Sequence, residues 1–402
     1  MGDVTVVRAI GRLATCGAAG TLEDAAVAFD QSSILYAGSE AGLLEAGGAG
    51  GWLDGADEHD AGGRLLTPGL VDAHTHPLYG GNRFAEIALR STGASYAELA
   101  AAGGGIASSV AATRATPHTE LEAAARHRLA KWLGGGATTV EAKSGYHLDE
   151  AGEASDVAIL ASLSGAPGLP SIEVTWLAGH AVAPEFADAD AYIDAATTWC
   201  GRARAAGARH ADVFCDAGYF TVEQGRRLLG AAAAAGLIPR IHADELDRTG
   251  GALLAAELGC ASADHLLKVN QADAKALAAA GVVATLAPVT ALAMGVRPPV
   301  AWLQEAGVTI ALGSDHNPGT CGTTSMSLVV ALAVAELGLS VDGALAAATA
   351  GGAASLRLAD RGRLEPGLRP DLVLWEADHE GAFAWGYGLQ PRQVWIGGRP
   401  AA

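Results

Sequence analysis

Residues 69–77 read Gly-Leu-Val-Asp-Ala-His-Thr-His-Pro and end an apolar run with two histidines separated by one residue. Side chains at positions i and i+2 of a β-strand face the same side of the sheet. His74 and His76 can therefore bind one metal ion together. The alternative is two unrelated histidines on one strand face, and it loses support because further candidate ligands follow downstream.

From Leu66 onwards, short apolar segments alternate with Ala- and Leu-rich segments, a pattern typical of β-α units around a parallel sheet. We expect helices over 120–133, 222–235 and 272–279, among others. Eight such units predict an α/β fold with a (β/α)8 TIM-type barrel over residues 66–360. The eight predicted strands cover residues 70–74, 138–142, 173–178, 212–215, 239–242, 262–265, 282–286 and 308–312.

An open doubly wound sheet is the alternative to a barrel. Such sheets often carry a GxGxxG turn after a strand, which binds a phosphate group. Residues 103–106 read Gly-Gly-Gly-Ile, which is a glycine turn without that spacing. The barrel is therefore the preferred interpretation.

Both chain ends have β character. Strand-like segments at 4–7 and 33–36 lie between clusters of Gly and Asp, and the β pattern returns at 367–375 and 393–398. We expect the two ends to pair in one small β-sandwich domain beside the barrel. This composite domain would comprise residues 1–65 and 361–402.

The chain of 402 residues is strongly acidic, with 44 Asp and Glu against 26 Lys and Arg and a formal net charge of −18. Such a surface repels polyanions, so we expect neither nucleic acid nor an anionic membrane as a partner. A small anionic substrate remains compatible with this charge if a local cation binds it. Half of the residues are hydrophobic, which predicts a substantial buried core.

The cysteines predict the redox compartment. Their number is odd and none forms a CxxC pair, so we expect reduced thiols in the cytoplasm. The first residues lack the basic and apolar segments of a signal peptide, and no apolar run reaches the length of about 18 residues that a membrane span needs. The five cysteines are Cys16, Cys200, Cys215, Cys260 and Cys321.

Histidines gather at the ends of the predicted strands. The active sites of such barrels lie at the C-terminal ends of the strands, so we asked which ends carry ligands or titratable groups. Five of the eight do, although the whole chain has only 12 histidines. A structural role would be the better interpretation of any single histidine, but it does not account for the group. The strand ends carry His74 and His76, then His180, then His242, then Asp264 and His265, and finally Asp315 and His316.

Three histidines and one aspartate suit Zn²⁺ or Fe²⁺ and leave a position for water. The ion would lower the pKa of that water and generate a hydroxide nucleophile. Asp315 could bind the ion and accept a proton, while His265 could orient water or transfer protons. Glu245, three residues after His242, is a further acid-base candidate, the alternative being an exposed loop carboxylate.

The fourth predicted strand ends in Val213-Phe214-Cys215-Asp216. A lysine at such a strand end could be carboxylated and bridge a second metal ion, and this strand end has no lysine. We therefore expect one divalent metal ion. Cys215 is interpreted as a small buried residue rather than a ligand.

The order of these motifs resembles the imidazolonepropionase family of the amidohydrolase superfamily. The segment 69–76, with its His-x-His pair, marks the superfamily, while Lys-Ser-Gly-Tyr at 143–146 and Asp-x-Asn-Pro-Gly at 315–319 are specific to the narrower family. The similarity runs in order from about residue 66 to 375. Further matching segments lie at 80–83, 95–96, 103–106, 141–142, 179–181, 242–245 and 262–265.

This resemblance implies a hydrolase that opens a cyclic amide, imidazolone-5-propionate, to N-formimidoyl-L-glutamate in histidine degradation. It implies that His74, His76, His242 and Asp315 bind the metal, and that Glu245 and His265 handle water and protons, with Asp315 also catalytic. We further expect a homodimer. The implied substrate-binding residues are Arg83, Tyr96, Tyr146, His180, Asn317, Gly319 and Thr320.

Arg83 also fits the physical expectation of a local cation. It lies seven residues after His76, in the first loop that follows a barrel strand, and a guanidinium can bind a carboxylate with two hydrogen bonds. The alternative for Arg83 is a surface charge pair. For Tyr96 and Tyr146 the alternative is packing within the loops.

Four positions depart from the family pattern, all in predicted loops near the barrel mouth. His147 stands where Gly is expected, His316 where a non-basic residue is usual, Val289 where a Pro-Gly step is typical, and Phe84 where an acidic residue is common. These changes leave open a related imidazolone, hydantoin, lactam or heteroaromatic amine as the substrate. A non-catalytic binding protein on the same fold is a further alternative, which the complete ligand set disfavours.

Overall fold

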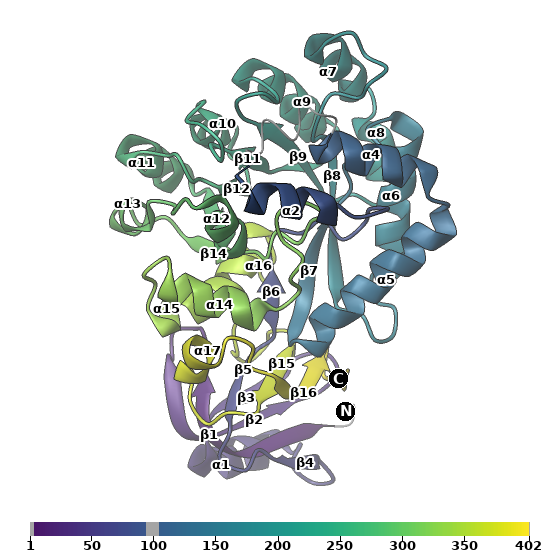
Figure 1. The fold of residues 1–402 in the computed structure, drawn as a ribbon. Coiled ribbons are helices and arrows are strands. Elements are labelled where there is room, and N and C mark those ends of the chain that lie inside the picture. Colours follow the sequence, from purple (N-terminus) through teal and green to yellow (C-terminus); the bar gives the residue numbers. More distant parts are fainter. Residues whose placement is uncertain (1–3, 94–103, 402) are drawn as a thin grey trace.

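The computed structural model describes residues 4–93 and 104–401 of the chain. Its larger part is a parallel barrel whose strands follow one another in chain order, with β6 and β14 at the two ends of the series (Figure 1). All eight predicted strands are present, and the short β10 precedes the fifth. The barrel strands are β6 (Leu70–Asp72), β7 (Ala137–Lys143), β8 (Ser171–Gly179), β9 (His210–Cys215), β10 (Ile238–Pro239), β11 (Ile241–Ala243), β12 (Ser262–His265), β13 (Val283–Leu286) and β14 (Ile310–Leu312).

The barrel closes between its first and last strands. Backbone hydrogen bonds run from Ala73 N to the Leu312 carbonyl (3.2 Å), from Asp315 N to the His74 carbonyl (2.9 Å) and from His76 N to the carbonyl of His316 (2.8 Å). An isolated parallel bridge joins Thr75 to His316. The (β/α)8 prediction is confirmed, and the seam that closes the barrel carries three of the predicted metal ligands.

Helices surround the barrel, and several begin where the sequence provides a cap. A capping box starts α9, in which the Thr221 side chain accepts from Gln224 N, and a second one at Asn270 starts α11. Asp149 accepts from two backbone N–H groups at the start of α6. The helices are α1 (Glu40–Gly50), α2 (Phe84–Ser91), α4 (Gly105–Ala115), α5 (His118–Gly134), α6 (Glu150–Leu163), α7 (Ala189–Thr197), α8 (Cys200–Ala206), α9 (Val222–Ala234), α10 (Gly251–Leu258), α11 (Gln271–Ala280), α12 (Pro288–Met294), α13 (Val300–Glu305), α14 (Met326–Ala335), α15 (Val341–Ala346), the π-helix η1 (Ala347–Gly351), α16 (Gly352–Ser355) and α17 (Gly381–Gly386).

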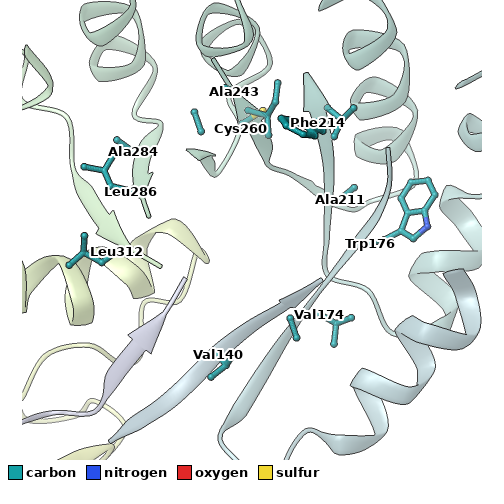
Figure 2. Close-up of a cluster of buried hydrophobic side chains, with 14 of the residues drawn as sticks. Val140, Val174, Trp176, Ala211, Phe214, Ala243, Cys260, Ala284, Leu286 and Leu312 are labelled. Carbon is teal, nitrogen blue, oxygen red and sulfur yellow. The ribbon is translucent and has the colours of Figure 1, made fainter. Parts of the chain in front are cut away.

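The apolar core lies between the strands and the surrounding helices. Figure 2 shows part of it, with Val140, Val174 and Trp176 projecting from neighbouring strands. These side chains are buried because successive residues of a strand face opposite sides, so one set packs under the helices. The other set points into the barrel, where many of the buried residues are polar or charged.

The two chain ends share one eight-stranded sheet, in the order β17-β16-β15-β5-β1-β2-β3, with β4 paired to β1. The pairing of β1 shifts between Val7 and Ile10, and Ala9 there has a positive φ of 51°. The first half of β1 pairs with β4 and its second half with β5, so the bend divides the sheet. The strands are β1 (Thr5–Ala14), β2 (Thr21–Phe29), β3 (Ile34–Ser39), β4 (Asp57–Asp60), β5 (Leu65–Pro68), β15 (Leu372–Trp375), β16 (Pro391–Ile396) and β17 (Arg399–Pro400).

This composite sheet is joined to the base of the barrel by Trp375. Its ring nitrogen donates to Thr67 Oγ1 at 2.9 Å, and a Cβ at Gly136, just before β7, would lie 2.7 Å from its ring. Glycine at 136 therefore allows the close contact. The domain boundaries at 65 and 361 stay a prediction. Among the described helices, none combines the length and apolar character needed to cross a membrane.

Candidate metal centre and substrate cavity

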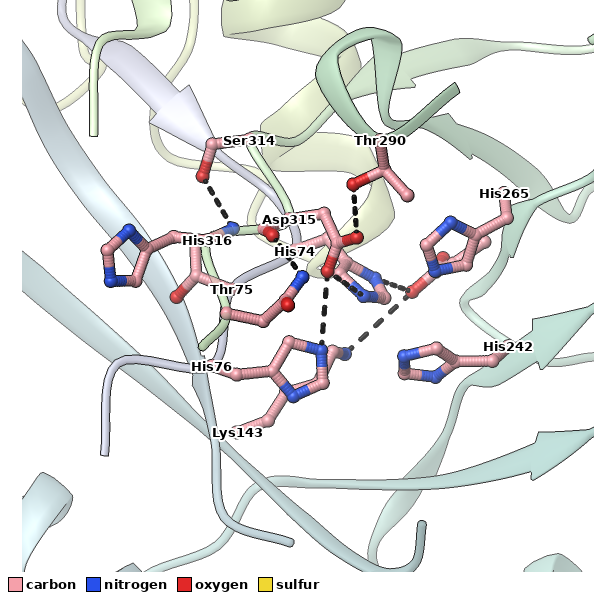
Figure 3. A network of polar contacts seen from close by, with 12 residues as sticks. His74, Thr75, His76, Lys143, His242, His265, Thr290, Ser314, Asp315 and His316 are labelled. Carbon is pink, nitrogen blue, oxygen red and sulfur yellow. Dashed lines mark hydrogen bonds and ion pairs between the residues drawn. The ribbon is translucent and has the colours of Figure 1, made fainter. Parts of the chain in front are cut away.

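Four predicted ligands converge at the C-terminal end of the barrel (Figure 3). Asp315 Oδ1 lies 3.6 Å from His74 Nε2 and 3.5 Å from His76 Nε2. Bonds of about 2.1 Å at tetrahedral angles would place two ligand atoms of one ion roughly 3.4 Å apart. Potential ligand atoms of His74, His76 and His242 also lie within 4.8 Å of one another. The spacing therefore fits a single ion.

The chemistry of these side chains also fits a cation. His74 Nε2 is buried and has no hydrogen-bond partner. Burial and then the repulsion of nearby Lys143 hold the pKa of His74 well below its ordinary value. Burial and His180 do the same for the pKa of His76. Neutral imidazoles with unpartnered nitrogens beside a carboxylate are a suitable donor set for Zn²⁺ or Fe²⁺.

Two carboxylates lie behind the histidine rings of the cluster. Asp264 Oδ2 lies 2.7 Å from His74 Nδ1, and Asp212 Oδ2 lies 3.0 Å from Nδ1 of His242. Asp264 accepts a hydrogen bond from Nδ1 of His74, which leaves Nε2 of His74 as the ligand atom, while Asp212 lies against His242 without a hydrogen bond to its Nδ1. Asp212 Oδ1 also accepts the backbone N–H of His242 at 3.1 Å, so β9 supports β11 at this point.

These carboxylates belong to a fully buried charge network inside the barrel. Lys143 Nζ donates to Glu141 at 2.7 Å and to Asp212 at 2.8 Å, and it lies 3.8 Å from Asp264. Arg240 donates to Asp264 at 3.2 Å. Burial opposes the charge of Lys143, but Asp212 and Glu141 nevertheless raise its pKa above the ordinary value. Burial opposes the charge of Asp212 and Asp264 as well, but nearby cationic groups, Lys143 among them, hold the pKa of both carboxyls below the ordinary value.

Glu245 lies beside the cluster, on the loop that follows β11. Its Oε1 is 3.7 Å from His265 Nδ1, and His265 Nε2 is buried without a hydrogen-bond partner. Burial raises the pKa of Glu245 to about 7. Asp216, at the end of β9, accepts the backbone N–H groups of Glu245 (2.6 Å) and Leu246 (2.8 Å), which fixes the loop. Both predicted acid-base residues therefore lie together at the centre.

The centre opens into a cavity of about 400 Å³. Apolar side chains form part of its wall, and Arg83, Tyr146, His180, Asn317 and Thr320 add polar groups. The predicted site residues within the described part of the chain are thus brought to one place. Tyr96 lies outside the described residues. The apolar lining residues, which the sequence did not single out, are Ile106, Phe214, Leu246, Ala293 and Met294.

Arg83 is the cation of this cavity. It is buried, and its Nε and Nη2 donate to Glu86 Oε2 at 2.8 and 2.7 Å. A Cβ at Gly319 would lie 2.3 Å from Arg83 Nη1, so a larger residue there would displace the guanidinium. Gly319, predicted to bind substrate, therefore acts first by making room for Arg83.

Asn317 shapes the loop that carries Gly319. Its side-chain oxygen accepts the N–H groups of Gly319 and Thr320, both at 2.8 Å, and its amide nitrogen donates to the carbonyl of Asp315 and to Thr320 Oγ1, both at 2.7 Å. The side chain thus orders the segment from the metal centre to the cavity wall.

Hydrogen bonds from His180, after β8, and to Glu153 of α6 hold the segment 143–148 in place. His180 Nδ1 donates to the Gly145 carbonyl at 2.9 Å, and burial lowers the pKa of His180 to about 3, so its ring is neutral and Nε2 is an acceptor. Glu153 Oε1 accepts the backbone N–H groups of His147 (3.0 Å) and Leu148 (2.9 Å). These bonds fix the segment that carries Tyr146 into the cavity.

None of the four departures from the family pattern lines the described cavity. His147 Nδ1 lies 2.7 Å from Asp156, and His316 bonds to the Thr323 carbonyl and the Tyr79 hydroxyl. Val289 packs against the core, and Phe84 is 75% exposed. The four side chains therefore lie outside the described cavity wall.

Sequence reasoning assigned no supporting role to the buried charged residues, although Asp264 was noted at a strand end. Glu141 and Lys143 sit two positions apart on one strand, and Asp212 and Asp264 also interrupt apolar strands. Charged residues at inward-facing strand positions are the signal that could have found them. Glu86, Asp216 and Thr290 carry no comparable signal, because their partners come from distant parts of the chain.

Known amidohydrolases are similar to this chain in sequence. A sequence profile of the Amidohydrolase family matches residues 80–402. The imidazolonepropionase of Anaeromyxobacter dehalogenans is 43% identical over 375 residues, which cover 91% of this chain and 87% of that protein. The imidazolonepropionase of Rhodococcus jostii is 40% identical over 406 residues, which cover 99% of this chain and 95% of the relative.

Solved structures share the fold at lower sequence identity. A. niger ochratoxinase superposes with a TM-score of 0.70 at 20% identity and covers 99% of this chain and 95% of its own. An adenosine deaminase from Xanthomonas campestris with bound zinc gives a TM-score of 0.70 at 21% identity, with coverages of 99% and 92%. These similarities concern the architecture.

Replacing Glu153 with Gln should change how stability depends on pH. Burial, and then Asp156, raise the pKa of Glu153 from 4.5 to about 7, so the folded state holds this proton more tightly than the unfolded chain. The corresponding stabilisation is present below about pH 4.5 and is lost as the pH rises through about 7. From pH 5 to pH 8, Glu153→Gln should gain roughly 1–3 kcal/mol relative to the parent in urea unfolding.

Glu120→Gln, on the exposed side of α5, is the matched control and should follow the parent at both pH values. Parallel stability curves for Glu153→Gln and the parent would contradict the prediction.

Proposed function

The chain belongs to the amidohydrolase family and, within it, to the imidazolonepropionases, and on that premise we propose how its residues hydrolyse imidazolone-5-propionate. The enzyme opens this cyclic amide to N-formimidoyl-L-glutamate, a step of histidine degradation. Water adds to the ring carbonyl carbon, the ring C–N bond breaks, and a proton goes to the leaving nitrogen. The observation that carries the assignment is that one cavity contains both the His/Asp cluster and Arg83.

His74, His76, His242 and Asp315 would hold one divalent metal ion. When bound, such an ion lowers the pKa of water and polarises a carbonyl oxygen. Zn²⁺ or Fe²⁺ suits this set of three imidazoles and one carboxylate. A second ion has little support at the end of β9, because burial raises the pKa of the Cys215 thiol to about 12 and Asp216 is engaged with backbone N–H groups.

Arg83 binds the propionate of the substrate. Its guanidinium lies in the cavity wall, and charge-assisted hydrogen bonds to a carboxylate are among the strongest polar contacts. His180 offers Nε2 as an acceptor, which suits a ring N–H of the substrate. These two contacts, with the Tyr146 ring beside His76 and His180, orient the ring so that its carbonyl faces the cluster.

Glu245, His265 and Asp315 move the protons. Asp315 accepts a proton as the water attacks, and Glu245 exchanges one with the leaving nitrogen. A carboxyl whose pKa is about 7 can serve as acid and as base near neutral pH. His265, whose Nδ1 lies 3.7 Å from Glu245 Oε1, orients the attacking water. Phe214, Leu246 and Met294 exclude bulk water from this side of the cavity.

We further propose that the enzyme acts in the cytoplasm as a homodimer. All five cysteines are free thiols, four of them buried, which suits a reducing compartment. Light scattering of the purified protein would test the dimer, since a single monomeric mass would exclude it.

The first measurement is turnover of freshly generated imidazolone-5-propionate, with metal analysis on the same sample. We expect hydrolysis at about one metal ion per chain. Asp315→Asn should reduce kcat by roughly a thousandfold or more, because it removes a charged ligand and a proton acceptor.

Asp24→Asn is the matched control. Asp24 shares the positive φ of Asp315, 47° against 51°, but lies exposed on β2. It should leave kcat unchanged. A metal-loaded parent without turnover of this ring would refute the proposed function, and near-normal kcat in folded Asp315→Asn would refute the residue assignment.

Replacing Arg83 with Gln tests the contact to the propionate. KM should rise roughly ten- to a hundredfold with a smaller change in kcat, because charge-assisted hydrogen bonds to the substrate are lost in the ground state and the transition state alike. Arg399→Gln, an exposed arginine that bonds to Gln31 in the composite sheet, is the control. An unchanged KM in Arg83→Gln would mean that another group binds the carboxylate.

A further inference from the structure

Within the described residues, Thr290 donates a hydrogen bond to the second carboxylate oxygen of Asp315. Its Oγ1 donates to Asp315 Oδ2 at 2.6 Å, while Oδ1 of the same carboxylate faces His74 and His76 (Figure 3). The donor comes from α12, after β13, and the acceptor follows β14. Both residues are buried, at 1% and 4% exposure, so water does not compete strongly for this bond.

The backbone around Asp315 is fixed by other bonds. Asp315 N donates to the His74 carbonyl at 2.9 Å, and its own carbonyl accepts from Asn317 Nδ2 at 2.7 Å. Ser314 N donates to Asp72 Oδ1 at 2.8 Å. These contacts hold the positive φ of 51°, which a non-glycine residue rarely adopts. They do not fix the rotation of the carboxylate.

Thr290 does not line the cavity, although its helix does. It occupies the third position of α12, after Pro288, whereas Ala293 and Met294 at the other end of the helix contribute to the cavity wall. A substitution at Thr290 therefore reaches the reaction through Asp315 and not through contact with the substrate.

We propose that Thr290 is a positioning residue, which turns the Asp315 carboxylate so that one oxygen faces the histidine pair and the other is held by the hydroxyl. This inference rests on the proposed function of the site. Without the hydroxyl, the carboxylate rotates, and Oδ1 no longer keeps the spacing of 3.5–3.6 Å to both imidazoles. Outer partners of metal ligands typically change metal affinity or activity by 10- to 100-fold.

The alternative is that Thr290 merely satisfies a buried hydroxyl, with Asp315 as a convenient acceptor. Under that interpretation, removal of the hydroxyl lowers stability and leaves both metal affinity and kcat near the parent values. The two interpretations therefore differ in what they predict for folded protein.

The test compares Thr290→Val with Thr290→Ser. Valine keeps the shape and removes the donor, so Zn²⁺ should bind about tenfold more weakly in competition with a chelator, and kcat should fall about tenfold or more with KM within about threefold. Serine keeps the hydroxyl and should restore both quantities to within about threefold of the parent. If Thr290→Val does not fold, Thr290→Ala takes its place in the same comparison with serine.

Thr67→Val controls for loss of a buried hydroxyl. Thr67 is fully buried in β5 of the composite sheet, where it donates to the Pro68 carbonyl at 2.7 Å, and its replacement should lower stability without changing Zn²⁺ affinity. Zn²⁺ affinity and kcat of the folded valine or alanine variant within threefold of the parent would overturn the inference. The chelator measurement needs no substrate, so it decides the part played by Thr290 even if imidazolone-5-propionate is not turned over.

Discussion

Two buried cations inside the barrel, Lys143 and Arg240, are the constraint on which the site depends. Removing an ion from water costs several kcal/mol unless partners compensate for the loss. Here the carboxylates of Glu141, Asp212 and Asp264 compensate for the lost hydration. Asp212 and Asp264 also face the histidines of the metal centre. The network is thus more than a set of ion pairs. Lys143 on β7 contacts Asp212 and Asp264, and these two carboxylates in turn contact the imidazoles of His242 and His74.

The same region closes the barrel. The backbone bonds between His74 and Asp315 and between His76 and His316 join the first strand to the last. His74, His76 and Asp315 therefore reach their positions only when the first and last strands have paired, because the backbone bonds that join these strands involve the same residues. Gly313 allows this approach, since a Cβ there would lie 2.7 Å from the Cβ of His74. Folding and site formation are coupled by the geometry of one contact between strands.

The strands and the ligands could be predicted because both follow local rules. Alternating apolar segments gave the eight barrel strands, and parallel strands end at one rim, so His74, His242 and Asp315 had to meet there. The outer partners could not be predicted in this way. Glu86, Asp216 and Thr290 act on side chains or loops through pairings that only the folded chain defines. Asn317 was expected to bind substrate, and the structure adds that its amide is bonded within its own loop.

The four unusual residues near the mouth show how a loop can vary without changing its site. Glu153 fixes the segment after Gly145 through the backbone N–H groups of His147 and Leu148, which every non-proline residue offers. The His147 side chain is then free to pair with Asp156 on α6, away from the cavity. The same holds for His316. Its backbone carbonyl accepts the bond from His76 that closes the barrel, while its ring bonds to the Tyr79 hydroxyl. Substitutions at such positions change what supports the loop, while the groups that face the substrate stay in place.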